Sequence, residues 1–327
     1  MENRLCEILV LAYKLKATDI HLDIMEGEKE KISIDLRIGQ DIIMLPPKEN
    51  DIRLFNYLKY RANLDVSDAF SPQSGSFNQR IGNIDLSLRF SVVSSYRRKN
   101  GVLRILNNHQ AITIASLSDD LSTYHYLSNI TKHHDGLFIF SGPTGSGKTT
   151  TVYTLLDETK GKKIFTLEDP IEVISDKYVQ IQVNEKQHLS YAEGIKQLMR
   201  HDPDVILIGE IRDSEAAKMA IRTAMTGHLV LTTIHSFSCC SVIDRLLDLG
   251  VEKYQLQDVL TGISSQRLFE YKGGEKRGIY EFMDKKELAY FFENKKTSEY
   301  FIPISKRISN ALNEKKINEK QAQPYLI

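Results

Sequence analysis

Hydrophobic and polar residues follow different patterns in successive parts of the chain. Near the amino terminus, the segments 31–37 and 84–90 alternate apolar with polar side chains, which is the period of a half-buried strand. Residues 1–106 are therefore predicted to form a small N-terminal α+β domain. The polar stretch 107–110 precedes a change of pattern, so we expect a linker over residues 107–117.

From residue 118 onward, amphipathic helical segments alternate with uninterrupted apolar runs. These runs are found at 137–140, 164–167, 205–208 and 229–231. Strands that are covered by helices on both faces need such runs, so residues 118–272 are predicted to form an α/β domain with an open parallel sheet. After Gly273-Gly274 the chain becomes charged and has a helical period through residue 294. We expect a C-terminal helical appendage over residues 273–327.

Composition adds a few restrictions. The chain has 327 residues, with 43 basic and 43 acidic side chains, so no long-range positive field favours nucleic acid or an anionic membrane. The apolar stretch 8–13 ends at Lys14, well short of a membrane-spanning length, and no secretory cleavage site follows it. We therefore expect a cytoplasmic protein. Cys6, Cys239 and Cys240 form no CxxC pair, so neither a disulfide framework nor a zinc site is expected.

A glycine-rich loop follows the apolar run at 137–140. Residues 142–149 match the Walker A pattern GxxxxGK[ST], in which glycines allow a tight turn around phosphate oxygens and the next helix directs backbone N–H groups at the anion. We expect Lys148 to reach the β- and γ-phosphates and the Thr149 hydroxyl to bind Mg²⁺. The predicted nucleotide-binding residues are Gly142, Pro143, Thr144, Gly145, Ser146, Gly147, Lys148, Thr149 and Thr150.

Acidic residues follow two other predicted strands. Glu210 ends the run that begins at Val205 and is the predicted Walker B acid, with Gly209 before it where a side chain would crowd the nucleotide. The segment 168–172, Glu-Asp-Pro-Ile-Glu, follows the run at 164–167. Its proline ends the strand and turns the acids toward the edge where open α/β sheets bind ligands. On this segment alone, acidic loop residues in solvent are the alternative.

Two histidines, His228 and His235, flank the apolar run at 229–231. A lone histidine at a strand end is more often a hydrogen-bonded core residue than a catalytic group, so spacing alone favours a structural role. A metal site that combines His235 with Cys239 and Cys240 does not fit the spacing of zinc ligands.

Four segments together resemble the Walker A, aspartate, Walker B and histidine boxes of the secretion-type ATPases, the superfamily of type II secretion, type IV pilus and competence motors. They are GPTGSGKTTT at 142–151, TLEDPIE at 166–172, LMRHDPDVILIGEIRD at 198–213 and TAMTGHLVLTTIHS at 223–236. In the first domain, residues 17–21 resemble the ASDIH motif of this family. Arg89 and Arg104 match two arginines that reach the nucleotide in the family.

This resemblance implies a RecA-like P-loop ATPase domain preceded by a smaller, PAS-like α+β domain. It implies a homo-hexamer that binds ATP and Mg²⁺ and converts hydrolysis into domain rotation. By the same resemblance, Glu172 is the general base that orients the attacking water, and Glu210 supports Mg²⁺. Arg89 and Arg104 would offset charge on the transferred phosphoryl group. The histidine that couples phosphate state to domain movement would be His235, with His228 nearby.

Departures from the family pattern narrow the subgroup. Many members carry a tetracysteine zinc insertion after the Gln-Arg-Leu segment, but here residues 266–268 run within ten residues into the segment 277–281, so no zinc is expected. We also expect that the long extra N-terminal domain of those members is absent, and the AIRNLIRE signature of the retraction motors has no match in this sequence. The chain therefore most resembles the ATPase that assembles the competence pseudopilus of transformable Gram-positive bacteria.

Such a protein is expected to drive pilin subunits out of the membrane through a polytopic inner-membrane platform protein. It would bind peripherally to the inner face of the cell membrane and would not bind nucleic acid directly. An ATP-binding scaffold with little turnover and a DNA-translocating motor are the alternatives from other classes.

Overall fold

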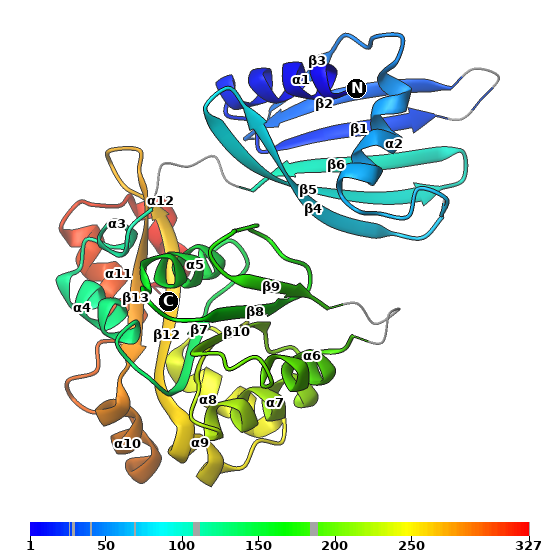
Figure 1. Cartoon of the computed structure of the whole chain (residues 1–327). Coiled ribbons are helices and arrows are strands. Elements are labelled where there is room, and N and C mark those ends of the chain that lie inside the picture. The colour runs from blue at the N-terminus through cyan, green and yellow to red at the C-terminus, as the bar shows by residue number, and fades with distance from the viewer. Residues whose placement is uncertain are drawn as a thin grey trace. The chain divides into compact units, whose positions relative to one another are not determined.

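The computed structural model describes residues 1–25, 27, 30–39, 41–68, 70–106, 112–183 and 189–326. The chain divides into two compact units (Figure 1). The first unit comprises Met1–Gln110 and Pro170–Ser175, and the second comprises Ala111–Asp169 and Asp176–Ile327. The short segment 170–175 thus belongs to the first unit, although the chain on both sides of it belongs to the second.

The first unit is an α+β arrangement built on a six-stranded antiparallel sheet. Its elements are α1 (Glu2–Lys14), β1 (Asp19–Met25), β2 (Lys31–Ile38), β3 (Asp41–Leu45), α2 (Asp51–Arg61), β4 (Gln73–Ile81), β5 (Ile84–Ser95) and β6 (Arg98–Ile105). The strand order is β3-β2-β1-β6-β5-β4. The strands predicted at 31–37 and 84–90 are confirmed as β2 and part of β5.

Alternation along these strands separates an apolar face from a polar face. Ile20 and Leu22 of β1 and Phe90 of β5 are buried in one core with Leu9 of α1 and Leu58 of α2. Because side chains alternate along a strand, the residues between them point to the other face of the sheet. That face carries the charged side chains of Arg89 on β5 and Arg104 on β6.

The second unit is an α/β arrangement around a seven-stranded sheet of order β13-β12-β7-β11-β10-β8-β9. Its strands are β7 (Gly136–Ser141), β8 (Ile164–Glu168), β9 (Val179–Gln182), β10 (Val205–Glu210), β11 (Leu229–Ile234), β12 (Leu260–Glu270) and β13 (Lys276–Met283). β12 pairs with β13 in antiparallel fashion, and the other neighbouring pairs are parallel. The four apolar runs that we predicted to be covered strands are confirmed as β7, β8, β10 and β11.

Helices connect these strands and cover the sheet. They are α3 (Ile114–Leu117), α4 (Leu121–Ile130), α5 (Lys148–Glu158), α6 (Tyr191–Leu198), α7 (Ser214–Met225), α8 (Cys239–Asp248), α9 (Lys253–Val259), α10 (Lys285–Asn294), α11 (Ile304–Asn313), α12 (Glu319–Ala322) and the 3₁₀ turn η2 (Gln323–Tyr325). Within the described parts of the chain, none of the helices is both long enough and apolar enough to cross a membrane.

The ends of the second unit differ from the sequence-based expectation. The predicted linker at 107–117 contains α3, and its residues 107–111 lie outside the described part of the chain. The prediction of a purely helical appendage over 273–327 was wrong for its first part, because β13 extends the sheet there. Helix α11 then buries Ile308 against Phe269 of β12 and Ile279 of β13. The domain limits themselves stay a prediction.

Glu281 on β13 is a buried carboxylate that joins two helices to the sheet. The Glu281 residue is 1% exposed. The Oε1 atom accepts a hydrogen bond from the backbone N–H of Cys239 (2.6 Å), and Oε2 accepts one from Ile304 (2.7 Å). These residues begin α8 and α11, where backbone N–H groups lack partners within the helix and the helix dipole favours a negative charge. Glu281 therefore fixes the start of both helices.

We expect Glu281→Gln to lower the free energy of unfolding by about 1–3 kcal/mol, because the amide keeps one acceptor oxygen but turns its NH₂ group toward the second N–H. Urea denaturation of the purified protein measures this difference. Glu275→Gln, at an exposed position in the β12–β13 turn, is the matched control and should change stability by less than about 1 kcal/mol. Equal stability of Glu281→Gln and the wild type would contradict this role.

Candidate functional site

Residues 142–147 form the loop between β7 and α5, at the carboxyl edge of the sheet. Gly142, Gly145 and Gly147 have φ angles of +147°, +78° and +87°, which L residues with a Cβ adopt only with strain. A Cβ built on Gly142 would lie 2.5 Å from the carbonyl oxygen of Gln266 on β12, whereas the space beside Gly145 is open. The loop therefore needs glycine for its turn and for its close approach to β12.

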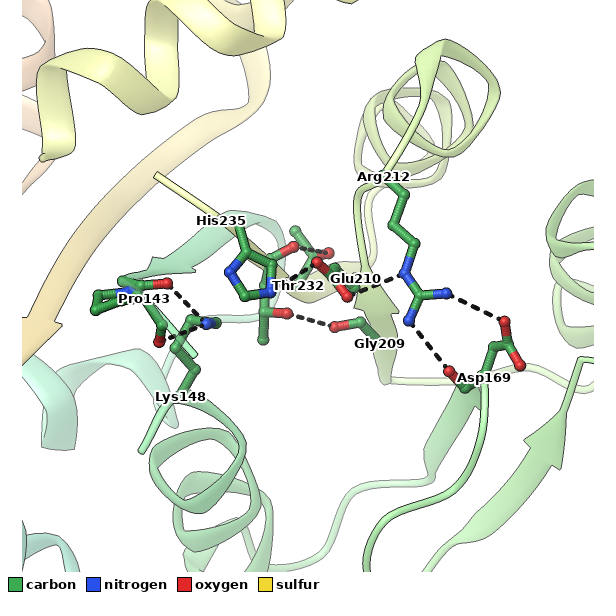
Figure 2. Close-up of polar contacts among 10 residues, drawn as sticks. Pro143, Lys148, Asp169, Gly209, Glu210, Arg212, Thr232 and His235 are labelled. Atoms are coloured by element: carbon green, nitrogen blue, oxygen red, sulfur yellow. Dashed lines mark hydrogen bonds and ion pairs between the residues drawn. The ribbon is translucent and has the colours of Figure 1, made fainter. Parts of the chain in front are cut away.

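The polar groups of this loop fit a phosphate. Helix α5 begins at Lys148, so its first backbone N–H groups are directed into the loop. The Lys148 ammonium donates to the carbonyl oxygens of Gly142 (2.8 Å) and Pro143 (3.2 Å), as Figure 2 shows for Pro143. The Ser146 hydroxyl is buried and has no hydrogen-bond partner among the described residues. A buried hydroxyl without a partner and a lysine held across the loop are suited to an anion that accepts from both.

Strand β12 supports the loop from the side. The Gln266 amide donates from Nε2 to the Ser146 carbonyl oxygen at 2.8 Å. Its register partner on β13 is Tyr280, whose hydroxyl is 2.8 Å from Thr151 Oγ1 in α5. The paired strands β12 and β13 thus hold the start of α5 at two points. The sequence drew attention to Gln266 only as part of a family segment, and its contact with the loop was missed.

Glu210, at the end of β10, lies at the centre of a polar network (Figure 2). Its Oε1 is 3.1 Å from Nε2 of His235, and its Oε2 accepts a hydrogen bond from Nε of Arg212 at 3.0 Å. Arg212 also donates to the carboxylate and the carbonyl oxygen of Asp169, each at 3.3 Å. The hydrogen bond to Glu210 raises the pKa of Arg212 above its usual value. The structure therefore brings Glu210 and His235 together, with an arginine that sequence reasoning did not select.

Parallel pairing explains why these residues meet. β10 pairs in parallel with β8 on one side and with β11 on the other. Residues that follow the carboxyl ends of parallel strands gather at one edge of the sheet. Asp169 follows β8, Arg212 follows β10 and His235 follows β11. β11 in turn pairs with β7, with Ile234 opposite Ser141, so His235 and the loop at 142–147 leave the sheet side by side.

Glu168 and Gly209 have a structural role in the same edge. Glu168 is 4% exposed, and it accepts hydrogen bonds from the hydroxyls of Tyr153 (2.7 and 2.6 Å) and Thr166 (2.6 Å). A Cβ on Gly209 would lie 3.3 Å from Glu168 Cα. The glycine therefore allows β10 to approach β8 closely, and the expectation that it also makes room for the nucleotide stays a prediction. The alternative of acids in solvent is wrong for Glu168, while Asp169 is exposed and paired with Arg212.

The placement of His228 also corrects an expectation. His228 precedes β11 and His235 follows it, so the two histidines lie at opposite edges of the sheet. A strand of six residues spans about 20 Å, and His228 is therefore remote from the loop at 142–147. Its Nδ1 is 2.9 Å from Thr226 Oγ1. Two histidines that flank one buried strand cannot share a site, and the expectation that His228 lies near His235 was wrong.

Arg89 and Arg104 lie together on the polar face of the first unit. They occupy directly paired positions on β5 and β6, so their side chains leave the same face of the sheet. The Nε of Arg104 is 2.7 Å from Asp19 Oδ1, and the Nε of Arg89 donates to Ser74 Oγ at 3.1 Å. Like charges at paired positions repel each other. Asp19 offsets part of this repulsion, and the remaining positive charge suits an anion.

Glu172 belongs to the same unit through the segment Pro170–Ser175. Ser76 on β4 is the register partner of Arg89, and its hydroxyl donates to the carbonyl oxygen of Ile171 at 2.9 Å. Glu172 therefore directly follows Ile171, which is anchored to β4, the strand that pairs with the strand of Arg89.

The predicted site residues thus fall into two groups. Glu172, Arg89 and Arg104 lie in the first unit, and the phosphate loop, Glu210 and His235 lie in the second.

Comparison with known proteins identifies the family. The family model described as "Type II/IV secretion system protein" matches residues 1–303. The chain belongs to this family. Membership confirms the resemblance inferred from the four sequence boxes, and with it the predicted enzyme class, an ATP-hydrolysing secretion ATPase.

The chain is similar to curated relatives over most of its length. It is 38% identical to the competence protein ComGA of Bacillus subtilis (strain 168) over 264 residues, which are 79% of this chain and 73% of ComGA. It is also 38% identical to the putative type II secretion system protein E of Escherichia coli (strain K12) over 266 residues, or 80% of this chain and 53% of that protein. The chain spans about half the length of the type II secretion relatives that it matches.

Solved structures share the fold. The Legionella pneumophila ATPase DotB superposes with a TM-score of 0.71 at 17% identity, over 99% of this chain and 95% of DotB. The pilus retraction motor PilT with bound ADP superposes with a TM-score of 0.72 at 24% identity, over 98% of this chain and 96% of PilT. These likenesses support an α/β fold for the chain.

Two glycines of the phosphate loop provide a matched test of its geometry. We expect Gly142→Ala to lower the free energy of unfolding by about 2–5 kcal/mol, because backbone strain adds to a clash with the Gln266 carbonyl. Gly145→Ala meets open space and should cost only the strain, about 1–2 kcal/mol. Urea denaturation of the two variants without nucleotide measures the difference. Equal losses would contradict the close approach of Gly142 to β12.

Proposed function

We propose that this chain is the ATPase motor that powers assembly of a type IV-like competence pilus for DNA uptake. The observation that carries the proposal is the phosphate loop beside the Glu210–His235 contact at one sheet edge, in a chain that is similar to ComGA over 73% of that protein. In this proposal the motor acts as a homo-hexamer, and ATP hydrolysis is coupled to domain rotation. The second unit is RecA-like, and the first unit is PAS-like.

ATP would bind with its phosphates in the loop at 142–147. The ammonium of Lys148 would exchange its carbonyl partners for oxygens of the β- and γ-phosphates, and the Ser146 hydroxyl would gain a partner. Thr149 and Glu210 offer hydroxyl and carboxylate oxygens, which are the ligands that Mg²⁺ prefers. Mg²⁺ would neutralise part of the negative charge on the phosphates when bound. Glu210 is open to such a role because its present partners, His235 and Arg212, have exposed side chains.

Hydrolysis also needs a base and a counter-charge for the transferred phosphoryl group. We assign the general base to Glu172, which orients the attacking water, and the counter-charge to Arg89 and Arg104. The paired arginines support this assignment because they concentrate positive charge on one face of the first unit. His235 would report the phosphate state, since any change at Glu210 alters the contact between the two side chains.

The motor would work through a polytopic inner-membrane platform protein of the pilus machine. It would bind peripherally to the inner face of the cell membrane and push pilin subunits out of the bilayer. Similarity to a competence protein supports this assignment over the other pilus and secretion systems. The match at 38% identity covers a larger share of ComGA than of the type II secretion protein.

Two variants separate nucleotide binding from hydrolysis. We expect Lys148→Ala to abolish turnover by removing the cation that faces the phosphates. Glu172→Gln should lower kcat at least about 100-fold, the effect of losing a general base, while the Kd for ATP changes less than about threefold. Phosphate release and binding of a fluorescent ATP analogue measure the two quantities, and Glu293→Gln, an exposed position on α10, is the matched control. Equal loss of nucleotide affinity in both variants would refute these roles.

A gene deletion tests the biological assignment. We expect the deletion strain to lack surface pili and DNA uptake, and wild-type protein supplied from a plasmid should restore both. Supplying the Lys148→Ala variant should restore neither, because assembly needs turnover. Electron microscopy of pili and transformation frequency measure these outcomes. Normal pili in the deletion strain would overturn the assembly role.

A further inference from the structure

Strand β12 places two neighbouring side chains on opposite sides of the sheet, as alternation along a strand requires. Gln266 contacts the phosphate loop, and Arg267 is buried on the other side, with 4% of the residue exposed. The guanidinium of Arg267 donates from Nη2 to the Phe237 carbonyl oxygen and from Nη1 to the Gln266 carbonyl oxygen, each at 2.9 Å. One side chain therefore binds two main-chain carbonyls far apart in the sequence.

The two carbonyls border the two loops of the proposed nucleotide site. Phe237 is the second residue after His235, in the loop that leads into α8. The Gln266 carbonyl is the group that lies 2.5 Å from a Cβ built on Gly142, so the phosphate loop turns directly against it. A guanidinium is planar, and its donors have a fixed geometry. Arg267 therefore sets the spacing between the loop after His235 and the strand position that supports Gly142.

The contact fixes the main chain of the loop at Phe237 and leaves the Phe237 side chain exposed. The Phe237 carbonyl also accepts from Ser265 Oγ at 3.3 Å, whereas the Phe237 residue is 77% exposed. The backbone N–H of Cys239 is bound by Glu281 at 2.6 Å. The loop is thus tied at both of its ends to the β12–β13 hairpin, and the exposed ring takes no part in holding it.

Burying Arg267 for a purely structural link costs free energy, because its charge is removed from water. Its remaining contacts are Ser265 Oγ at 3.4 Å and the ring of Tyr325, whose centroid is 5.4 Å from the guanidinium carbon. Within the described residues its Nε has no partner, and it forms no salt bridge. Burial lowers the pKa of Arg267. A buried cation without a carboxylate in hydrogen-bond contact costs stability, and the charge of Glu281 offsets part of that cost.

We propose that Arg267 is a positioning residue for ATP hydrolysis, which holds the loop after His235 at a fixed distance from the phosphate loop. The inference rests on the proposed nucleotide site. Through this link the imidazole of His235 stays against Glu210 while the loop at 142–147 keeps its turn. Its contribution is to the geometry of the transition state, so it affects turnover more than nucleotide binding.

The first test replaces the planar guanidinium of Arg267 by the single ammonium group of a lysine. Arg267→Lys keeps a cation behind the phosphate loop but loses the fixed geometry of two separated donors, so we expect kcat to fall about tenfold or more while the Kd for ATP changes less than about threefold. Arg307→Lys is the matched control, because Arg307 also lies over an aromatic ring, Phe282 at 4.8 Å, and pairs with Asp120. It should leave kcat and Kd unchanged. An unchanged kcat in Arg267→Lys would overturn the proposal.

The second test asks whether Arg267 acts through His235. In a double-mutant cycle, Arg267→Lys should lower kcat less than about threefold in a His235→Ala background, because the group that it positions is already gone. If the kcat loss of the double variant instead equals the product of the losses of the two single variants, the link is refuted. Hydrogen exchange without nucleotide provides a readout independent of turnover, and amides of residues 236–241 should exchange faster in Arg267→Lys than in Arg307→Lys. Equal exchange in the two variants would also overturn it.

These readouts separate the inference from the proposed function. Absence of phosphate release by the wild-type protein would count against the proposed motor, whereas the exchange measurement would still test the contact between Arg267 and the loop. Wild-type turnover with unchanged kinetics in Arg267→Lys would instead leave the motor intact and refute the positioning role.

Discussion

The parallel pairing of β7, β11, β10 and β8 is the constraint on which the second unit depends. Strands that run in one direction end at one edge, so the phosphate loop, His235, Arg212 and Asp169 meet although they come from four separate boxes of the sequence. Helix α5 then adds its first backbone N–H groups at the same edge. Strand β12 extends the parallel order beyond β7, and this extension brings Gln266 beside the loop. A change of strand direction would separate these groups by the length of a strand.

Burial distinguishes the two carboxylates that end β8 and β10. Glu168 is enclosed and accepts several hydroxyl hydrogen bonds, so it is already satisfied, and breaking those bonds would leave a buried charge without partners. Glu210 is bound by His235 and Arg212, whose side chains are about half exposed. Water can replace such partners at little cost. The residue able to change partners during a nucleotide cycle is therefore Glu210, and Glu168 keeps the strand edge in place.

Local patterns carried most of the information that the sequence provided. The phosphate loop could be predicted because one short segment specifies both its turn and its chemistry, and the covered strands could be predicted from uninterrupted apolar runs. The edge of the sheet that a residue occupies depends on strand direction, which is why His228 was misplaced. The sequence marks Arg267 only as part of the Gln-Arg-Leu segment at 266–268, and nothing in that segment predicts its burial. Its burial follows from contacts with Phe237 and Tyr325, which are distant along the chain.

The chain passes from the second unit to the first between Asp169 and Pro170, close to both groups of site residues. Asp169 is held by Arg212 in the second unit, and Ile171 is held by Ser76 in the first. The two residues are separated by Pro170 alone, whose φ is fixed by its ring, and a step of two residues spans at most about 7 Å. Glu172 directly follows Ile171, so its backbone is held within the first unit by the contact between Ile171 and Ser76. Ser76 is the register partner of Arg89, so the proposed base and this arginine are anchored to neighbouring strands of one sheet.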